Sequence, residues 1–267
     1  MPRKSTRDEG GRLSGTQSIE RALTLVREIA AHNRTGSRLL DLASRSGLQR
    51  PTVHRMLKCL TQENMVQQDP DSHRYYLGPM VFELGLTAAP RFNLREICHP
   101  SMMRIAEVTG DTVFLTQRSG LDSVCVERQE GAFPIKTFTL EIGMRRPLGV
   151  GTGSLAILSA LSEEEVKHVI AANTPRLAEY GMTAASLLAQ VKRAQKIGFA
   201  VREMPSLAGV RSVGQAVHNQ SAVPFAALSV SAIASRMNEK RVGELATLLR
   251  TETRLVEKQL ASASERR

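Results

Sequence analysis

The chain of 267 residues lacks the features of disulfide-bonded, secreted and membrane-spanning proteins. Its three cysteines, Cys59, Cys98 and Cys125, are far apart in the sequence and form no CxxC pair or His/Cys cluster. Disulfide bonds and a cysteine-rich zinc site are therefore not expected, and a reducing cytoplasm is the natural setting. Segment 1–15 is polar and has no apolar signal-peptide core, and no run of about 18 apolar residues predicts a membrane span.

The motifs of common enzymes and cofactor-binding folds are also missing. The glycine-rich segment 148–158, LGVGTGSLAIL, has no phosphate-binding GxxxxGK(S/T) pattern, and Ser154 lies in GTGSL rather than in a GxSxG nucleophile elbow. The carboxylates at 163–165 follow Ser162 at a predicted helix start, where capping and the helix dipole explain them better than acid–base chemistry. The six histidines are scattered without an HExxH motif. We therefore predict no catalytic residue, no cofactor and no metal site.

Positive charge is present in excess, with 36 Lys and Arg against 26 Asp and Glu and a net charge of +10. Residues 1–77 hold 13 Lys and Arg against 8 Asp and Glu, and the remaining residues hold 23 against 18. Each part thus carries a charge of +5, and the shorter segment is more basic per residue. A basic segment suits the phosphate backbone of a nucleic acid, an anionic membrane surface or simple solubility, and charge alone leaves these open.

Residues 38–77 combine helical and strand patterns in an informative order. A first helix follows Ser37, a suitable N-cap, and ends at Gly47, which provides a sharp turn. A second helix repeats apolar residues every three or four positions from Val53 onward. The sequence DPDS at 69–72 then has the turn chemistry of a short hairpin. Helix, tight turn, helix and hairpin predict a winged helix-turn-helix, whose second helix fits the major groove of DNA.

The polar residues of this motif are the candidate DNA contacts. An arginine can bond to two acceptors of one guanine, and a threonine can contact a thymine methyl group or a phosphate. Local roles stay open for each: a solvated charge for the Arg and Lys residues, packing for His54, helix capping for Thr52 and turn stabilisation for Arg74. The candidates are Arg50, Thr52, His54, Arg55 and Lys58 on the second helix and Arg74 in the hairpin.

After the hairpin, Gly78 and Pro79 interrupt the chain, and a short apolar helix over Met80–Ala89 ends before Pro90. This helix is predicted to connect two domains. Its apolar residues pack either against a partner subunit or against the amphipathic helix predicted over residues 17–32 of the same chain. The sequence leaves both arrangements open.

The remaining residues mix helical and strand periods. Helices are predicted over Leu94–Thr109, 163–172, 183–197 and 238–260, and strands over Thr112–Gln117, Val124–Glu127, Phe138–Ile142, Phe199–Arg202, Ser212–His218 and Phe225–Ser231. Strands, then helices, then strands predict an α+β domain with a mostly antiparallel sheet. The glycine-rich run opens a helix at Gly151–Ser154, where exposed N–H groups attract a carboxylate.

Several segments together resemble the IclR family of bacterial transcriptional regulators over roughly residues 17–260. They include QSIERALTLV at 17–26, LASRSGLQRPTVHRMLKCL at 42–60, LREICHPSMMRIAEVTGDTVFL at 94–115, RRPLGVGTGSLAIL at 145–158 and ALSVSA at 227–232. Each segment is weakly specific alone, but their order and spacing are specific. The resemblance implies an N-terminal winged helix-turn-helix, a linker helix and a C-terminal ligand-sensing domain of the GAF type.

On this basis the chain divides into a disordered arm at 1–15, a DNA-binding domain at 16–77, a linker helix at 78–93 and an effector-binding and oligomerisation domain at 94–262. The resemblance also implies a homodimer or homotetramer that binds a palindromic DNA operator. A small organic acid then changes the affinity for DNA, and the family includes both repressors and activators.

The resemblance further implies an effector pocket in the C-terminal domain. The serines at its predicted positions also suit close packing, and its apolar candidates also suit a plain core. The candidates are Thr152 and Gly153 in the glycine-rich loop, Glu203 before GVR, Ser212 after it, Ser229 and Ser231 in the ALSVS strand, and Ile135, Phe138 and Leu140 on the opposite wall.

Two departures from the family pattern bear on the effector. Leu155 stands where family members often have Lys, and the stretch before GVR, REMPSLAG, holds only one acidic residue. A less acidic and more apolar pocket suits a larger effector, such as an aromatic or aliphatic acid. The same departures favour the alternative that the C-terminal domain only oligomerises. A small-molecule enzyme is a more distant alternative, and a membrane-surface role has only the positive charge in its favour.

Overall fold

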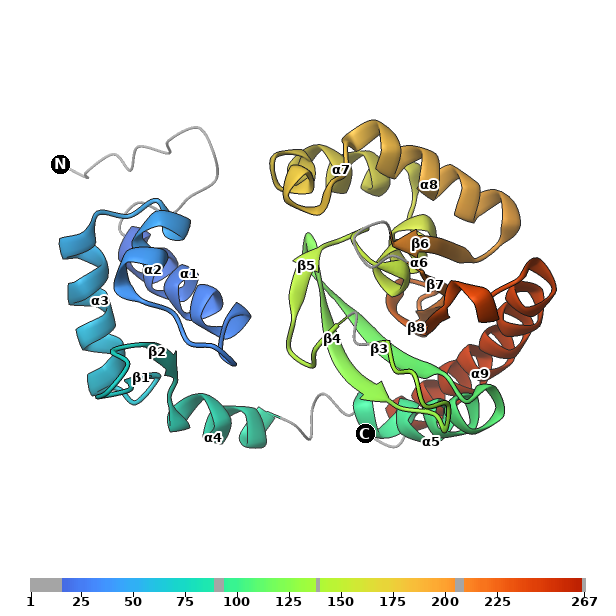
Figure 1. Cartoon of the computed structure of the whole chain (residues 1–267), viewed down its shortest axis with the longest axis horizontal. Helices are drawn as coiled ribbons and strands as arrows, with labels where there is room; N and C mark the ends of the chain where they lie inside the picture. Colours follow the sequence, from blue (N-terminus) through green and yellow to red (C-terminus); the bar gives the residue numbers. More distant parts are fainter. Residues whose placement is uncertain (1–15, 89–93, 138–139, 205–208, 266–267) are drawn as a thin grey trace, which may run out of the picture. The chain divides into compact units, whose positions relative to one another are not determined.

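The computed structural model describes residues 16–88, 94–137, 140–204 and 209–265. By its internal contacts the chain divides into two compact units, Met1–Arg91 and Phe92–Arg267, which are described separately below (Figure 1). The predicted arm at 1–15 and the candidate Phe138 lie outside the described residues. None of the helices in the described ranges has the length and apolar content to cross a membrane.

The N-terminal unit packs three helices and a hairpin around one small core. Gly47 ends the second helix in the left-handed conformation (φ +66°) that glycine adopts without strain. Leu25, Leu42, Val53 and Leu57 are fully buried where the helices meet. The elements are α1 (Gln17–Ala31), α2 (Leu39–Ser46), α3 (Arg50–Gln62), β1 (Val66–Gln68), β2 (Tyr75–Leu77) and α4 (Pro79–Ala88).

The start of α2 differs from the prediction. Ser37 is not its N-cap, because the helix begins one residue later, after Arg38, whose backbone N–H donates to the Asp41 carboxylate (3.2 Å). Ser37 instead exchanges two backbone hydrogen bonds with Tyr75 (3.1 and 2.8 Å). The prediction was wrong because this long-range pairing, which extends the hairpin by one bridge, outcompetes the local capping role.

The C-terminal unit is built on a six-stranded sheet with the order β5-β4-β3-β8-β7-β6, and every neighbouring pair is antiparallel. The fold class predicted from the sequence is therefore confirmed. The strands are β3 (Thr112–Ser119), β4 (Asp122–Gln129), β5 (Arg145–Pro147), β6 (Ala200–Met204), β7 (Val210–His218) and β8 (Pro224–Ile233).

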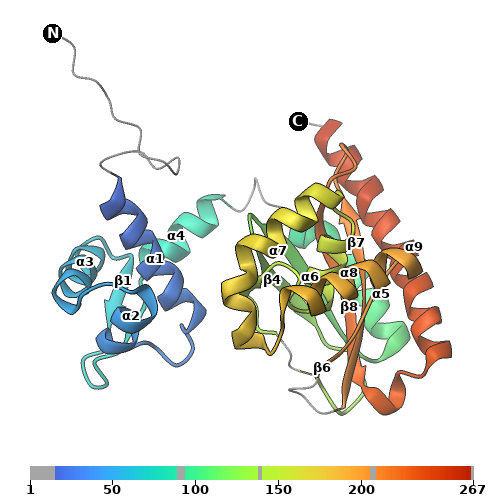
Figure 2. The same ribbon diagram turned by 90° about the horizontal axis from the view of Figure 1, so that it is seen from above.

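Helices cover both faces of this sheet (Figure 2). On one face α5 (Leu94–Thr109) and α9 (Glu239–Glu265) pack on apolar strand residues that include Val113, Leu115, Val213 and Val230. On the other face α6 (Thr152–Ser159) packs on β3, β6, β7 and β8, and α7 (Glu163–Leu177) and α8 (Ala184–Ile197) lie beyond it. Because neighbouring strand residues point to opposite faces, each strand supplies two separate cores.

One predicted strand is wrong. Residues 140–142 of the expected strand Phe138–Ile142 are not in a strand, because the chain turns there: Met144 N–H donates to the Glu141 carbonyl (3.0 Å), and Gly143 has a φ of +83°. The strand at this edge is β5, a three-residue segment that pairs with β4 and ends in Pro147. Proline is tolerated there because an edge strand has one side without a partner.

Candidate DNA-binding surface and effector site

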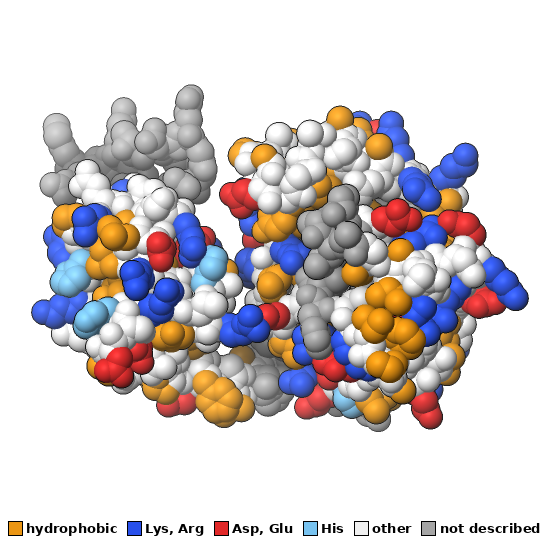
Figure 3. Space-filling view, in the orientation of Figure 1, with side chains coloured by type: hydrophobic (Ala, Val, Ile, Leu, Met, Phe, Trp, Pro, Cys, Tyr) orange, Lys and Arg blue, Asp and Glu red, His pale blue; other side chains and the backbone are white. Residues whose placement is uncertain are grey.

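Helix α3 presents a polar face to solvent. Val53 and Leu57 anchor the opposite face in the core of the N-terminal unit. Arg50, His54 and Lys58 are exposed and recur every fourth residue, so they form one stripe along the helix, and Arg55 is exposed beside it. Thr52 is half-buried in the first turn. Lys, Arg and His side chains gather over this part of the unit in Figure 3. The predicted contacts on α3 thus share one accessible surface.

Arg74, the predicted contact in the hairpin, is bonded to the loop between α1 and α2. Its guanidinium donates to the backbone carbonyls of Thr35 and Gly36 (3.3 and 3.0 Å), which form the loop between α1 and α2. Gly36 is held there at φ +67°, and a Cβ on it would lie 2.5 Å from the Cζ atom of Tyr76. Arg74 and Tyr76 therefore fasten this loop to the hairpin, which is the turn-stabilising role that the sequence left open for Arg74.

A row of polar residues crosses the sheet on the face covered by α6. Arg202 pairs with Ser212, Ser212 with Ser231, and Ser231 with Thr112 in adjacent strands, so these side chains share one face. The hydroxyls of Ser212 and Ser231 are 2.7 Å apart, and Thr137 Oγ1 donates to the Ser231 carbonyl (3.0 Å). Ser229, two residues before Ser231 on the same strand, points to the same face, and we call the buried serines Ser212, Ser229 and Ser231 the hydroxyl row.

The start of α6 lies directly against the hydroxyl row. A Cβ on Gly153 would be 2.8 Å from Thr116 Oγ1 and 3.4 Å from Ser229 Oγ, so this helix turn approaches the sheet as only a glycine allows. Thr116 Oγ1 and Thr152 Oγ1 are buried and have no hydrogen-bond partner among the described residues. Because a buried hydroxyl without a partner costs free energy, two such groups at one place indicate a site for a polar ligand.

A cavity of about 580 Å³ opens beside the row, within the size range of small-molecule sites. Two half-buried arginines, Arg146 of β5 and Arg202 of β6, line it together with Tyr180 and Met182 from the segment between α7 and α8. Burial, and then the charge of Arg146, lower the pKa of Arg202 to about 10. Burial also lowers the pKa of Arg146. A smaller hollow lined by Thr116 and Ser154 shares Arg146 with the cavity.

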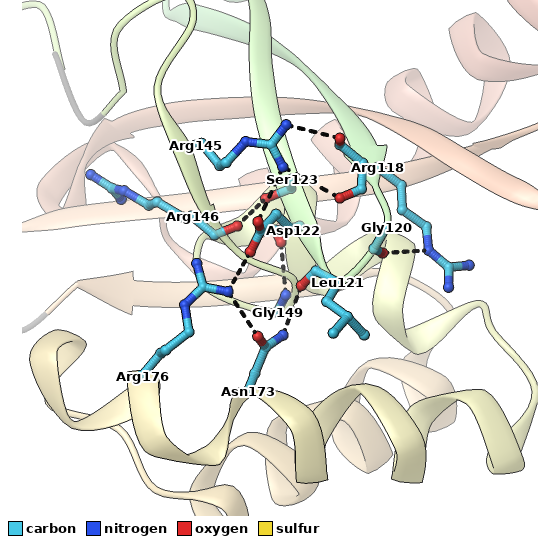
Figure 4. Close-up of polar contacts among 12 residues, drawn as sticks. Arg118, Gly120, Leu121, Asp122, Ser123, Arg145, Arg146, Gly149, Asn173 and Arg176 are labelled. Atoms are coloured by element: carbon cyan, nitrogen blue, oxygen red, sulfur yellow. Dashed lines mark hydrogen bonds and ion pairs between the residues drawn. The ribbon is translucent and has the colours of Figure 1, made fainter. Parts of the chain in front are cut away.

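Asp122 holds the strand that carries Arg146 (Figure 4). Its carboxylate accepts hydrogen bonds from Arg145 (3.1 Å) and from Arg176 of α7 (2.7 Å). Ser123 Oγ donates to the Arg146 carbonyl (3.5 Å), and Asn173 Nδ2 of α7 donates to the Leu121 carbonyl (2.7 Å). The turn between β3 and β4, strand β5 and helix α7 are thereby joined, and this junction fixes the position of Arg146 at the edge of the cavity.

Comparison with known protein families decides between the possible roles of these surfaces. Residues 18–70 match the model described as the IclR helix-turn-helix domain, and residues 86–257 match the bacterial transcriptional regulator IclR C-terminal domain. The chain belongs to the IclR family. It is accordingly a DNA-binding transcriptional regulator with an effector-binding C-terminal domain, and the family is one of regulators rather than enzymes.

Curated members of the IclR family align with this chain over most of their length. The acetate operon repressor of Salmonella typhimurium is 28% identical over 241 residues, covering 87% of this chain and 86% of that protein. The transcriptional repressor IclR of Escherichia coli is 26% identical with the same coverage.

Two solved IclR structures show the same fold. The regulator from Alicyclobacillus acidocaldarius has a TM-score of 0.73 at 22% identity and covers 91% of this chain and 98% of its own. An IclR homologue from Microbacterium hydrocarbonoxydans, complexed with 4-hydroxybenzoate, has a TM-score of 0.70 at 19% identity. The match covers 92% of this chain and 99% of the homologue.

Within the IclR fold, the structure separates the predicted effector residues into two groups. It brings together Thr152, Gly153, Ser212, Ser229 and Ser231 at the start of α6. Glu203 pairs with Arg211 of β7, and its carboxylate is 3.5 Å from the Arg211 guanidinium. Because neighbouring strand residues point to opposite faces, Glu203 lies on the face opposite Arg202 and Ser212. Glu203 therefore reaches the cavity only at its exposed rim.

Of the apolar candidates, Ile135 is not part of the expected wall. Ile135 is 57% exposed and lines neither the cavity nor the smaller hollow, and Phe138 lies outside the described residues.

Sequence reasoning missed Arg202, Arg146 and Thr116. The sequence held one signal for Arg202. A strand was predicted over 199–202, and an arginine is unusual in a strand whose sheet consists mainly of small and apolar residues. Its pairing with Ser212 was not visible in the sequence. In the described part of the chain no group of His, Cys, Asp or Glu residues is arranged to hold a metal ion.

Proposed function

We propose that this protein is a ligand-responsive transcriptional regulator in which a small organic acid, bound at the hydroxyl row, changes the affinity of α3 for an operator. The proposed DNA contacts are Arg50, Thr52, His54, Arg55 and Lys58 on α3 and Arg74 in the hairpin. Arg55 lies beside the stripe of Arg50, His54 and Lys58, and an arginine at such a position suits bidentate contact with a guanine edge. Lys58, further along the helix, suits a phosphate.

The observation that supports an effector at the hydroxyl row is the pair of unsatisfied hydroxyls at Thr116 and Thr152. A carboxylate bound at the start of α6 accepts several hydrogen bonds at once and would satisfy both, and the rest of the effector then lies along the hydroxyl row towards Ser212 and Ser231. The start of α6 adds the partial positive charge of a helix N-terminus, which favours an anion over a neutral ligand. The effector class is therefore an organic acid, and 4-hydroxybenzoate, with which the Microbacterium homologue is complexed, belongs to that class.

We also propose self-association through α4. Phe82, Leu84 and Leu86 of this helix are 69%, 53% and 58% exposed, and none of its residues is buried within the N-terminal unit. Hydrophobic side chains gather over α4 in Figure 3. Phe82 and Leu86 are one helical turn apart and share a face, and exposed apolar side chains of this kind are typical of a subunit interface. Of the two roles that the sequence left open for this helix, the exposure favours contact with a second copy of the chain.

Calorimetric titration of the full-length protein with a panel of aromatic and aliphatic monocarboxylic acids tests the effector proposal. We expect at least one acid to bind, and we expect Ser231→Ala to weaken it by about tenfold, as loss of a hydrogen bond to a charged group predicts. Ser159→Ala is the matched control, because that hydroxyl bonds only within its own helix (Ser159 Oγ to Ala156 O, 3.0 Å). Binding that is unaffected by Ser231→Ala would place the effector elsewhere, and a C-terminal domain that only oligomerises would bind no acid.

A further inference from the structure

We infer that the cavity beside the hydroxyl row receives a second acidic group of the effector, so that the effector is a dicarboxylic acid with an apolar spacer and Arg202 is its principal cationic contact. This inference rests on the proposed function, since it assigns the first carboxylate to the hydroxyl row. Three features of the molecule support it: the environment of Arg202, the charge around the cavity, and the distance between the two positions.

The environment of Arg202 lacks an anion. Its guanidinium contacts the Gly149 carbonyl (3.3 Å) and the Met182 sulfur (2.9 Å), and neither of these acceptors is charged. Among the described residues no carboxylate lies within ion-pair distance of Arg202. Burying a guanidinium beside neutral acceptors alone costs free energy, and a carboxylate delivered by a ligand would offset that cost. The planar, five-donor guanidinium is also the side chain best matched to a carboxylate.

The charge of the inner cavity is positive. Arg146 and Arg202 are half-buried on its inner side, and burial lowers the pKa of each, with the charge of Arg146 contributing at Arg202. The two carboxylates on the lining, Glu179 and Glu203, are exposed to solvent, and Glu203 already faces Arg211. Water screens the charges of the two exposed carboxylates more than those of the two half-buried arginines. An anion that enters the cavity is therefore attracted to the arginines at its inner wall.

The two anion positions are adjacent, and part of the cavity wall is apolar. Arg202 and Ser212 are direct neighbours across β6 and β7, with Cα atoms about 5 Å apart in such a pair. The apolar residues that line the cavity include Val150, Met182 and Ala194, and the Tyr180 ring lies 6.0 Å from the Arg146 guanidinium carbon. One molecule with a short apolar or aromatic spacer can therefore contact both positions.

The test compares ligands of nearly equal size that differ by one charge. The probes are terephthalate with its monomethyl ester and adipate with its monomethyl ester, titrated calorimetrically into the full-length protein. We expect at least one diacid to bind about tenfold more tightly than its monoester, as one added charge-assisted contact predicts. Arg202→Gln should erase that difference, whereas Arg202→Lys should retain part of it. Lys192→Gln, which removes an exposed charge of α8 that does not line the cavity, should retain it fully.

Thermal unfolding of each variant shows whether it is folded, and the Lys variant of Arg202 keeps the test valid if the Gln variant is not. The inference is wrong if no diacid binds more tightly than its monoester, or if the preference persists in Arg202→Gln. Its failure is distinguishable from failure of the proposed function. If the monoesters bind and Ser231→Ala weakens their binding, the proposed site at the hydroxyl row stands. Only the second acidic contact would then be wrong.

Discussion

Arg202 lies directly opposite Ser212 in the antiparallel pairing of β6 with β7, so a guanidinium and a buried hydroxyl share one face of the sheet. The pairing continues through Ser231 of β8 to Thr112 of β3, which gives a polar row across four strands beneath α6. This face of the sheet is otherwise lined by small and apolar residues. It carries the charge of Arg202 at the β6 edge and the hydroxyls of Ser212 and Ser231 in the central strands. This arrangement supports both the effector site and its proposed second acidic contact.

Substitution of Arg55 by Ala is expected to weaken specific DNA binding by about 1–3 kcal/mol, the range for loss of a bidentate contact to a base. Arg55 is exposed and no ion pair or hydrogen bond of its guanidinium is found in the described residues, so thermal stability should not change. Arg27→Ala, an exposed arginine on α1, is the control. Fluorescence anisotropy with labelled duplex measures the affinity, and equal effects of the two variants would show that α3 is not the specific contact.

The loop between α1 and α2 should be sensitive to a single methyl group. Gly36→Ala places a side chain at φ +67° and against the Tyr76 ring, so we expect a loss of about 2 kcal/mol or more in the free energy of unfolding. Gly243→Ala is the matched control: it lies in α9 with open space around it, and it should gain about 1 kcal/mol from helix propensity. Urea unfolding measures both, and a stable Gly36→Ala variant would contradict the packing described for this loop.

Thiol reactivity separates the three cysteines without mutation. Burial and the charge of Glu127 raise the pKa of Cys98 to about 12, and burial raises the pKa of Cys125 to about 11, whereas Cys59 is exposed on α3. At mildly alkaline pH, Ellman's reagent should therefore react rapidly with one thiol, and with the other two only after denaturation. Specific DNA should slow the rapid reaction, because Cys59 lies on the helix proposed to contact it. Three equal rates would contradict the burial of Cys98 and Cys125, and a rate that DNA leaves unchanged would contradict the role of α3.

The pairing of α5 with α9 should depend on pH. Burial acts to raise the pKa of Glu252, but hydrogen bonds from Arg104 and Ser101 outweigh it, so the pKa lies below its ordinary value of 4.5. A lowered folded-state pKa contributes stability that is fully present above the unfolded value and is lost as pH falls through the folded one. Urea midpoints should therefore show Glu252→Gln less stable than the wild type at neutral pH.

That difference should shrink progressively below pH 4.5. Glu107→Gln, an exposed carboxylate of helix α5, is the control and should differ little from the wild type at any pH. A difference between Glu252→Gln and the wild type that stays constant through the acid range would show that the Arg104–Glu252 pair is not the cause.

The elements with strong periodicity were predicted well. Helix Leu94–Thr109 and the start of the strand at Thr112 coincide with the prediction, because an amphipathic repeat and an apolar run are local properties of the sequence. The serines of the ALSVS strand share a face for the same reason, since alternate strand residues point the same way. The glycine-rich segment opens α6 as expected.

Features that depend on pairing between distant segments could not be predicted. Glu203 was assigned to the pocket from the sequence, and Arg202 was not considered. Which of these two neighbours lies opposite Ser212 depends on the register between β6 and β7, because a shift of one residue would exchange them. Ser37 has the chemistry of an N-cap, yet its partner is Tyr75 of the hairpin. Strand β5 is short and consists of two arginines and a proline, which have little strand propensity, so only its pairing with β4 defines it.

Coupling between acid binding and DNA binding can be measured on one protein sample. Duplexes selected from a random pool by the full-length wild type are titrated by fluorescence anisotropy, with and without an acid that calorimetry shows to bind. For a ligand-responsive regulator we expect a change of about fivefold or more in the dissociation constant for DNA, the usual scale of coupling between two sites. Ser231→Ala should remove this response while leaving the affinity without acid unchanged. An acid that binds the wild type and leaves its DNA affinity unaltered would contradict the proposal that the hydroxyl row controls α3.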